Sequence, residues 1–338
     1  MITMLATIFV FGVIVFIHEL GHFVTAKACG MRVDEFAIGF GPALVKVQKG
    51  ETLYSIRAIP LGGYNKIAGM SDEEELDDRS FLNKPTWQRF IVISAGAVFN
   101  FLLAILIVFS ILVISGAPSP SSEPVIGRMH STGPAAIAHL EVNDKITSIN
   151  GKEITKWTDI AIALQGTQKH AIPIVVERNG QMIESTIIPM ETDNGRAIIG
   201  INPSSIMTKY PISEAAYRAV AYTVNMVHQM ITGLWSMIVG TEEAQLAGPV
   251  GVAQMAGEVA QIGFVYLLQF TAILSINLGV INLLPLPVLD GGHLIIILVE
   301  SITRRKLPPK ALQYIQMAGL ALLLFIFLYT TVQDISRI

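Results

Sequence analysis

Two histidines and a glutamate near the start of the chain have the spacing of a metal-dependent hydrolase. They occur in the sequence His18-Glu19-Leu20-Gly21-His22, an H-E-x-x-H motif. Side chains four residues apart share one face of a helix, so both imidazoles can reach one tetrahedral zinc ion. The glutamate between them can act as the general base that activates water. With 7 histidines and 26 acidic residues in 338, chance would give only about 0.01 such matches.

A catalytic zinc ion also needs a third protein ligand. No histidine follows His22 until His130, so the motif has no continuation that could supply it. Asp34 and Glu35 are the nearest candidates, in a loop that leads to strand-like sequence. Asp290 is the better one, because an aspartate in an apolar span needs a cation; a kinked helix with Asp290 paired to an arginine is the alternative. Four further polar or helix-breaking residues interrupt the same stretch: Asn277, Asn282, Pro285 and Pro287.

The composition is that of a membrane protein. Of the 338 residues, 52% are hydrophobic and only 14% are charged, whereas soluble proteins carry about 25% charged residues. The mean hydropathy is +0.56. A formal net charge of −3 argues against a nucleic-acid partner. The one cysteine, Cys29, cannot form an intramolecular disulfide.

Four apolar stretches are long enough to cross a bilayer, which takes about 20 residues. We expect these spans at about 1–26, 90–114, 264–289 and 311–332. The first lacks the basic start and small-residue cleavage site of a signal peptide, so we interpret it as an anchor. The H-E-x-x-H motif closes this span, and ionisable residues at membrane depth are usually functional.

The distribution of lysine and arginine predicts the orientation of the spans. Basic residues follow the first span, precede the second and fill the connection at 304–310. With four spans these sites share one side, which predicts that the motif lies near the cytoplasm and both termini outside. Residues 219–240 carry a narrow apolar stripe, from which we expect an interfacial helix within a 202–263 connector. A fifth span is the alternative, although it would move the 304–310 cluster outside.

The sequence between the spans predicts two further folded parts. Strand-like runs at 124–129, 145–149, 172–177 and 182–188, with a helix at 158–164, indicate a small α+β domain at 123–201. Residues 116–124 have the composition of a linker. Between the first two spans, residues 36–70 predict a β-hairpin region with a turn at Leu61-Gly62-Gly63. The acidic run 71–78 is predicted to be a solvated loop, since it lacks the spacing of a calcium loop.

Two motifs together carry a family resemblance. His18 to His22, with Asn282-Leu-Leu-Pro-Leu-Pro-Val-Leu-Asp-Gly-Gly292, resemble the site-2 protease family of intramembrane zinc metalloproteases. Residues 133–151 resemble the PDZ domains of bacterial proteases, with His139 and Asn143 where glycines are usual. The segment 62–69 is similar to the bacterial regulator-of-sigma-E type, and the single PDZ-like unit to its shorter members. Residues 96–100 match the family's Gly-Pro-x-x-Asn with alanine in place of proline.

The resemblance covers nearly the whole chain and implies a fold and a site. The fold would be a multi-pass α-helical membrane protein of about four transmembrane helices, with a membrane-associated β-hairpin and an inserted α+β PDZ-like domain. Its N-terminal membrane core would span 1–115 and its C-terminal core 264–338. His18, His22 and Asp290 would bind Zn²⁺, and Glu19 would activate the water. Asn282 would position the substrate backbone or stabilise the oxyanion. The implied substrate-binding residues are Tyr54, Ile56, Gly62, Gly63, Tyr64, Asn65, Pro285 and Pro287.

We therefore expect a zinc endopeptidase of the bacterial cytoplasmic membrane. Its partners would be membrane lipid and single-pass membrane substrates, such as anti-sigma factors or remnant signal peptides. The PDZ-like domain would bind peptides or filter substrates by size, and residues 248–251 would be a hinge or a plain turn. One alternative is a PDZ-bearing scaffold with a non-catalytic metal site, which Glu19 argues against. Another is an ion transporter, which predicts inverted repeats that the sequence does not show.

Overall fold

The computed structural model describes residues 1–70, 77–192, 194–240, 248–305 and 308–337. The chain forms two compact units. We call Met1–Ile111 with Pro211–Ile338 the membrane core, and Leu112–Tyr210 the PDZ-like domain. Most of the acidic run predicted as a solvated loop, residues 71–76, lies outside the described residues.

Four helices of the described residues are long and apolar enough to cross a membrane. They are α1 (Ile2–Ala28), α2 (Thr86–Ile114), α7 (Phe264–Leu283) and α9 (Pro309–Arg337). The prediction of a multi-pass helical protein with four spans is confirmed. The third helix is shorter than the predicted 264–289. Pro285 and Pro287 cannot continue a helix because they lack a backbone N–H, and α8 (Asp290–Thr303) begins beyond them.

The membrane core packs α1, α2 and α7 around shared apolar side chains, among them Val10, Ala104 and Ile276. Helices approach closely where a glycine faces a neighbour. A Cβ on Gly21 of α1 would lie 2.5 Å from the carbonyl oxygen of Ala95 in α2. The H-E-x-x-H segment is therefore pressed directly against the backbone of α2.

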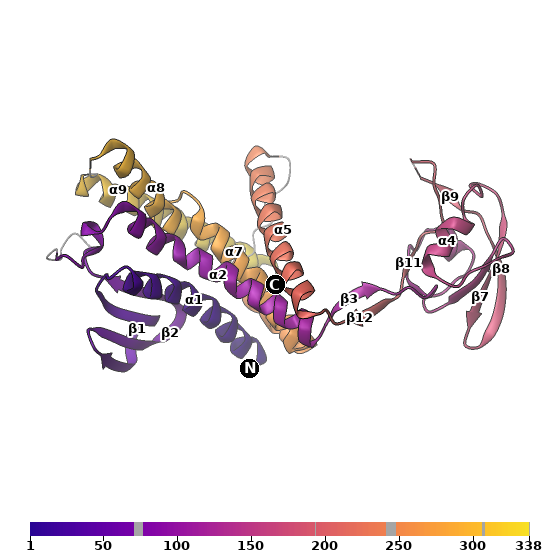
Figure 1. The fold of residues 1–338 in the computed structure, drawn as a ribbon, viewed down its shortest axis with the longest axis horizontal. Helices are drawn as coiled ribbons and strands as arrows, with labels where there is room; N and C mark the ends of the chain where they lie inside the picture. The colour runs from indigo at the N-terminus through magenta and orange to yellow at the C-terminus, as the bar shows by residue number, and fades with distance from the viewer. Residues whose placement is uncertain (71–76, 193, 241–247, 306–307, 338) are drawn as a thin grey trace. The chain divides into compact units, whose positions relative to one another are not determined.

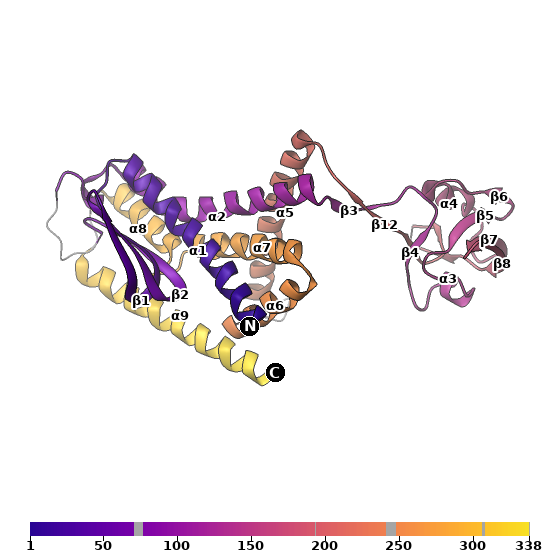
Figure 2. The same cartoon turned by 90° about the horizontal axis from the view of Figure 1, so that it is seen from below.

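Two further helices pack against these apolar side chains. α5 (Ile212–Val239) packs Met226, Met230 and other apolar side chains against the core, and is not among the four candidate spans. Its predicted interfacial position stays a prediction. α6 (Pro249–Ile262) begins in the segment for which a hinge or a turn was predicted. That segment is the capped start of a helix, because the Asp334 carboxylate of α9 accepts hydrogen bonds from the N–H groups of Gly248 (3.0 Å) and Gly251 (2.7 Å). Figure 2 shows α6 beside the end of α9.

A two-stranded sheet lies against α1 in the membrane core (Figure 1). β1 (Val33–Lys49) pairs antiparallel with β2 (Thr52–Ile67), with several register shifts. The tight turn between the two strands lies at Gly50 and Glu51, and the predicted turn residues Leu61-Gly62-Gly63 are assigned to β2. The chain nevertheless reverses direction between residues 56 and 63, because 53–56 and 63–66 run in opposite directions along 35–38. Residues 35–38 pair with both 53–56 and 63–66, so they lie between the two halves of β2. The register could not be read from local sequence, because the two halves of β2 pair with the same residues of β1 from opposite sides.

The PDZ-like domain is built on an antiparallel sheet in the order β6-β5-β7-β8. These strands are β5 (Lys145–Ile149), β6 (Lys152–Glu153), β7 (Ile172–Arg178) and β8 (Gln181–Ile187), and the helices are α3 (Pro134–Ile137) and α4 (Trp157–Ala163). Shorter pairs join β4 (Ile126–Met129) to β11 (Ile201–Pro203), β9 (Met190–Glu191) to β10 (Ala197–Ile198), and β3 (Ala117–Pro120) to β12 (Ser205–Thr208). The linker expected at 116–124 is therefore partly a paired strand.

His139 and Asn143, which stand where the PDZ pattern has glycines, both adopt the left-handed backbone conformation that glycine favours, with φ of 58° and 74°. Asparagine tolerates this region better than most residues. Arg178 holds the segment: it donates to the His139 carbonyl oxygen at 3.0 Å and to both oxygens of Asp144 at 2.7 Å. The Asp144 residue is 0% exposed. The backbone bend is therefore kept without glycine, and the hydrogen bonds from Arg178 hold it in place. We call these hydrogen bonds the arginine clamp.

Replacing Arg178 with methionine should open the PDZ-like domain, because it leaves the buried Asp144 carboxylate unpaired. We expect amide hydrogen exchange in β5, β7 and β8 of the full-length protein to become faster by on the order of 100-fold. The matched control is Lys169→Met, which removes the exposed 2.7 Å pair with Glu191 and should change exchange by less than about fivefold. Equal effects of the two variants would contradict the clamp.

Candidate metal centre

The side chains of His18, His22 and Asp290 meet at one point of the membrane core. The two histidines lie one helical turn apart on α1, and their Nε2 atoms are 3.3 Å apart. Asp290 is the first residue of α8, and its Oδ2 lies 3.4 Å from each Nε2. Three potential ligand atoms from opposite ends of the chain therefore form a nearly equilateral triangle.

This triangle fits one face of a tetrahedral zinc site. Zn–N and Zn–O bonds of about 2.0–2.2 Å in tetrahedral geometry separate neighbouring ligand atoms by about 3.3–3.6 Å. The Oδ2 atom of Asp290 is buried and accepts no hydrogen bond from the described residues. A buried carboxylate oxygen without a partner is unfavourable, and a cation among the three ligands removes that cost. The donor set and its spacing fit zinc.

The face of α2 that carries Val92, Gly96 and Asn100 orients both histidines. The ring nitrogen Nδ1 of His22 donates to the Val92 carbonyl oxygen at 2.8 Å, which leaves the Nε2 lone pair for a metal. The side-chain amide of Asn100 lies 3.2 Å from His18 Nδ1. The atom that faces the ring is the amide nitrogen Nδ2, and the amide oxygen Oδ1 is buried without a hydrogen-bond partner among the described residues. Turning the amide by about 180° would let this oxygen accept the Nδ1 proton of His18 and leave the Nε2 of His18 free in the same way. The four-residue spacing of Gly96 and Asn100 is the signal that could have identified this face, whereas Val92 acts through its backbone carbonyl and gives none.

Gly96 is required by the close approach of α2 to the two rings. A Cβ at this position would lie 2.3 Å from His22 Nε2 and 2.5 Å from His18 Cε1. Both distances are far below van der Waals contact, so no larger residue fits without moving the histidines. Gly96 is the first residue of the segment 96–100, whose sequence resembles a family motif, and these distances give the physical reason for a glycine there.

A tight loop fixes Asp290 at the start of α8. Cβ atoms on Gly291 and Gly292 would lie 2.1 Å and 2.3 Å from the carbonyl oxygens of Leu284 and Leu286. Val288 has a φ of 82°, which is strained for a β-branched residue and is typical of functional sites. The first turn of a helix also stabilises a carboxylate. The strain and the glycines together hold the Asp290 carboxylate toward the histidines.

A cavity of about 260 Å³ opens beside these ligands. The side-chain amide of Asn65 in β2 donates to Oε2 of Glu19 at 2.7 Å and to the Glu19 carbonyl oxygen at 2.8 Å. Asn282, in the last turn of α7, has its Nδ2 3.3 Å from His18 Nε2. The lining residues are His18, Glu19, His22, Gly63, Tyr64, Asn65, Ile67, Met70, Ile93, Asn282, Val288, Leu289, Asp290 and His293. Metal ligands, a carboxylate base and an amide donor thus share one cavity.

Three of the eight predicted substrate-binding residues line this cavity, and five do not. Gly63, Tyr64 and Asn65 line the cavity, whereas Tyr54, Ile56, Gly62, Pro285 and Pro287 do not. The ring of Tyr54 packs against Phe23, with centroids 5.8 Å apart. Ile56 is 52% exposed. The two prolines shape the loop before Asp290, and Pro287 contacts Gly319 of α9.

The two nearer candidates for the third ligand are engaged elsewhere. Asp34 pairs with Arg32 at 3.0 Å, and Glu35 pairs with Arg57 at 2.7 Å. Burial raises the pKa of Glu35, but hydrogen bonds from Arg57, Tyr64 and Ser55 outweigh it and lower the pKa below its usual value. Within the described ranges, the one group of His, Cys, Asp and Glu side chains spaced to hold a metal is His18, His22 and Asp290.

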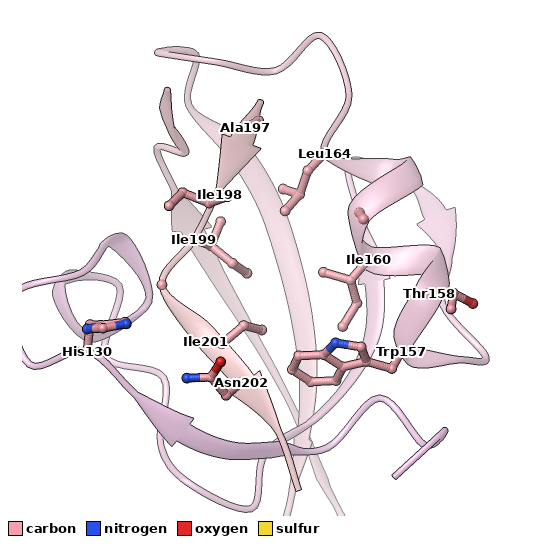
Figure 3. Close-up of a pocket in the computed structure, with 12 residues that line it drawn as sticks. His130, Trp157, Thr158, Ile160, Leu164, Ala197, Ile198, Ile199, Ile201 and Asn202 are labelled. Atoms are coloured by element: carbon pink, nitrogen blue, oxygen red, sulfur yellow. The ribbon is translucent and has the colours of Figure 1, made fainter. Parts of the chain in front are cut away.

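A second cavity, of about 550 Å³, lies in the PDZ-like domain between α4 and residues 197–202 (Figure 3). Trp157, Ile160 and Leu164 line it from the helix side, facing Ile199 and Ile201. The lining is mostly apolar, and His130 is among its few polar side chains.

Comparison with protein families matches residues 6–326 to the model of Peptidase family M50. The chain belongs to peptidase family M50, the site-2 protease family. FN1322 of Fusobacterium nucleatum is 37% identical to this M50 chain over 339 residues, covering 99% of each. The regulator of sigma-W protease RasP of Bacillus subtilis is 31% identical over 419 residues, again covering 99% of each. The zinc metalloprotease RasP of Geobacillus kaustophilus is 31% identical, covering 99% of this chain and 98% of its own.

The M50 chain is thus a zinc-dependent metalloendopeptidase and an integral membrane protein. The expected family, enzyme class and cofactor are confirmed. Among solved structures, the PDZ domain of an SdrC-like protein from Listeria innocua aligns with 24% of this chain and 92% of its own, at 19% identity and a TM-score of 0.22.

Replacing Asp290 with asparagine should remove the third zinc ligand. We expect about one zinc per wild-type chain by elemental analysis of detergent-purified protein. The loss of affinity in Asp290→Asn should exceed the 10- to 100-fold that losing a supporting partner typically costs. The controls are Asp34→Asn and Glu35→Gln, which should keep their zinc. If Asp290→Asn keeps its zinc and a control loses it, the assignment moves to that control residue.

Replacing Gly96 with alanine should displace the histidine rings without removing any ligand. We expect Gly96→Ala to bind zinc at least about 10-fold more weakly, since a 2.3 Å contact cannot persist. Gly12→Ala is the matched control on α1, because a Cβ there meets no atom within 4 Å. Full zinc occupancy in Gly96→Ala would show that α2 does not set the ring positions.

Proposed function

We propose that this protease hydrolyses peptide bonds within or next to the transmembrane segments of single-pass membrane proteins. The observation that carries the proposal is the position of the site. Two of the three ligands, with the Glu19 carboxylate between them, lie on α1, which is apolar enough to cross a membrane, and the third, Asp290, follows the end of the candidate span α7. A substrate reaches such a site from within the bilayer, so its own membrane segment is the part that is cut.

His18, His22 and Asp290 would hold the zinc ion. When bound, zinc polarises the carbonyl of the scissile peptide and makes water a stronger nucleophile. The Val92 carbonyl accepts the Nδ1 proton of His22, which directs the Nε2 lone pair of His22 toward the ion. The Asn100 amide, with its oxygen turned toward His18, would do the same for that ring. The ligand triangle has one open side, which is what catalytic zinc sites require and structural sites lack.

Glu19 would act as general base and then as general acid. Its carboxylate takes a proton from the attacking water and returns it to the leaving amine nitrogen, so the proton count balances over the reaction. The hydrogen bond from Asn65 fixes the carboxylate beside the ligands. This placement favours an enzyme over a scaffold with a non-catalytic metal site, where a base would have no task.

The side-chain amide of Asn282 would donate a hydrogen bond to the developing oxyanion or to the substrate backbone. Its amide lies 3.3 Å from His18 Nε2, and that lone pair cannot serve both the amide and a zinc ion. Once the histidine binds metal, the amide is available to donate to a substrate carbonyl oxygen in the same cavity. One donor of this kind typically contributes about 10²- to 10³-fold to the rate.

Residues 63–65 of β2 would pair with an unwound stretch of substrate. A peptide bond inside a helix is shielded by its own hydrogen bonds, so the substrate must become extended before attack. Pairing with the strand beside Glu19 would satisfy the freed backbone groups, as in other cases of strand addition. Gly63 fits this role, because a Cβ there would already lie 3.0 Å from the Cγ atom of Glu19.

The proposal also includes the orientation of the protein in the membrane and the class of its substrates. The basic residues around the spans support an orientation with the metal centre near the cytoplasmic face and with both termini and the PDZ-like domain outside. Anti-sigma factors and remnant signal peptides are the proposed substrates, and the relative named regulator of sigma-W protease is compatible with the first class.

The proposal is tested with Glu19→Gln in proteoliposomes that contain a single-pass substrate. We expect cleavage to fall at least 10²- to 10⁴-fold, as for loss of a general base, while zinc content stays at about one per chain. Glu258→Gln, on an exposed residue of α6, is the control and should cleave at the wild-type rate. Substrates with Gly or Pro in the membrane helix should be cut faster than a poly-leucine version. Wild-type cleavage by Glu19→Gln would refute the assigned base, and cleavage confined to soluble peptides would refute the intramembrane substrate.

A further inference from the structure

A second polar cavity of the membrane core, separate from the metal centre, lies where α2 begins and α8 ends. It has a volume of about 290 Å³ and is lined by Thr86, Arg89, Glu300, Ser301, Arg304 and Arg305. Figures 1 and 2 both show these two helix ends side by side. Three guanidinium groups face one carboxylate, so the lining carries a net charge of about +2. Such a cavity attracts an anion.

Arg89 is the buried part of this cavity. It is 8% exposed, unlike most arginines on a protein surface. Its Nη2 donates to Glu300 Oε2 at 3.0 Å, and its guanidinium carbon lies 5.2 Å from the centre of the Phe81 ring. Its Nε is buried and has no hydrogen-bond partner among the described residues. One carboxylate therefore leaves the five donors of this group incompletely used.

Arg304 and Arg305 form the open side of the cavity. Arg304 ends α8 with a φ of 54°, and both residues are exposed. Within the described part of the chain, neither side chain has an ion-pair partner. Thr86 and Ser301 add two hydroxyl groups to the lining. Several guanidinium groups with hydroxyl donors are the arrangement that recognises phosphate oxygens.

The position of the cavity favours a lipid over a free anion. Thr86 is the first residue of a candidate membrane span, and α8 ends just before another one begins at Lys310. Span ends lie at the depth of the phospholipid headgroups. Exposed apolar side chains flank the cavity, with Trp87 59% exposed and Ile302 73% exposed. A tryptophan beside basic residues at a span end is typical of the headgroup region.

We propose that this cavity binds the phosphate of an anionic phospholipid, with the acyl chains lying along the apolar surface beside Trp87 and Ile302. Arg89 supplies the buried charge, and Arg304 and Arg305 close over the phosphate from the open side. Because the Arg89–Glu300 pair joins α2 to α8, the bound headgroup braces the two helices that carry Gly96 and Asp290. The proposal requires a membrane and is independent of the proteolytic activity.

The test counts lipids on the purified full-length protein by native mass spectrometry, in micelles that contain either phosphatidylglycerol or phosphatidylcholine. The variant Arg304→Asn with Arg305→Gln removes two charges, and asparagine tolerates the left-handed backbone at position 304. The matched control is Lys84→Gln with Lys310→Gln, which removes two charges near span ends but outside the cavity lining. We expect wild type and control to retain phosphatidylglycerol, and the arginine variant to bind it about 30-fold more weakly.

The zinc content of the arginine variant shows whether it is folded, so a loss of lipid in zinc-replete protein supports the site. Equal lipid binding by all three proteins, or equal loss in the variant and its control, overturns it. Equal retention of the two lipids by wild type also overturns it, since the cavity then does not select an anionic headgroup. Stabilisation of wild type by inorganic phosphate alone, without retained phosphatidylglycerol, rejects a lipid as the occupant.

Discussion

Two imidazoles and a carboxylate cannot be buried together among apolar helices at low cost unless a cation balances them. Much of the membrane core follows from this constraint. α1 supplies both histidines, α8 supplies Asp290, and the backbone of α2 must come close enough to orient the rings. Each close approach depends on a glycine, at Gly21 between helices and at Gly96 beneath the rings. The geometry of the centre therefore depends on the absence of side chains at Gly21 and Gly96 as well as on the ligands themselves.

The same constraint explains why the site spans the whole sequence. A membrane helix has few polar groups, so ligands for one ion come from several helices, each broken or packed tightly at one place. α7 stops at Leu283 and α8 begins at Asp290, and the intervening loop leaves backbone groups without helical hydrogen bonds beside a candidate span. Such a break is tolerated because the loop packs within protein, against Gly319 of α9.

The sequence alone predicts the spans and the metal ligands, because both depend on residue type. Ionisable residues stand out in apolar segments, and Asp290 was the better candidate for this reason. The path of β2 could not be predicted, since residues 53–56 and 63–66 both pair with the same part of β1. Nor could the contribution of Val92, which acts through its backbone carbonyl and leaves no trace in residue type. His139 and Asn143 show the opposite case, where a departure from a motif preserves the backbone angle that the motif requires.

The cap that Asp334 places on α6 has a mechanical consequence. Among its described contacts with the core, α9 packs Gly319 against the loop before Asp290 and caps the first turn of α6 with Asp334. If α9 moves as a rigid helix, a tilt at one of these contacts also displaces the other. Movement of α9 would release the start of α6 and the loop before Asp290 in a single motion. The last helix of the core thus contacts both the start of α6 and the loop that positions Asp290.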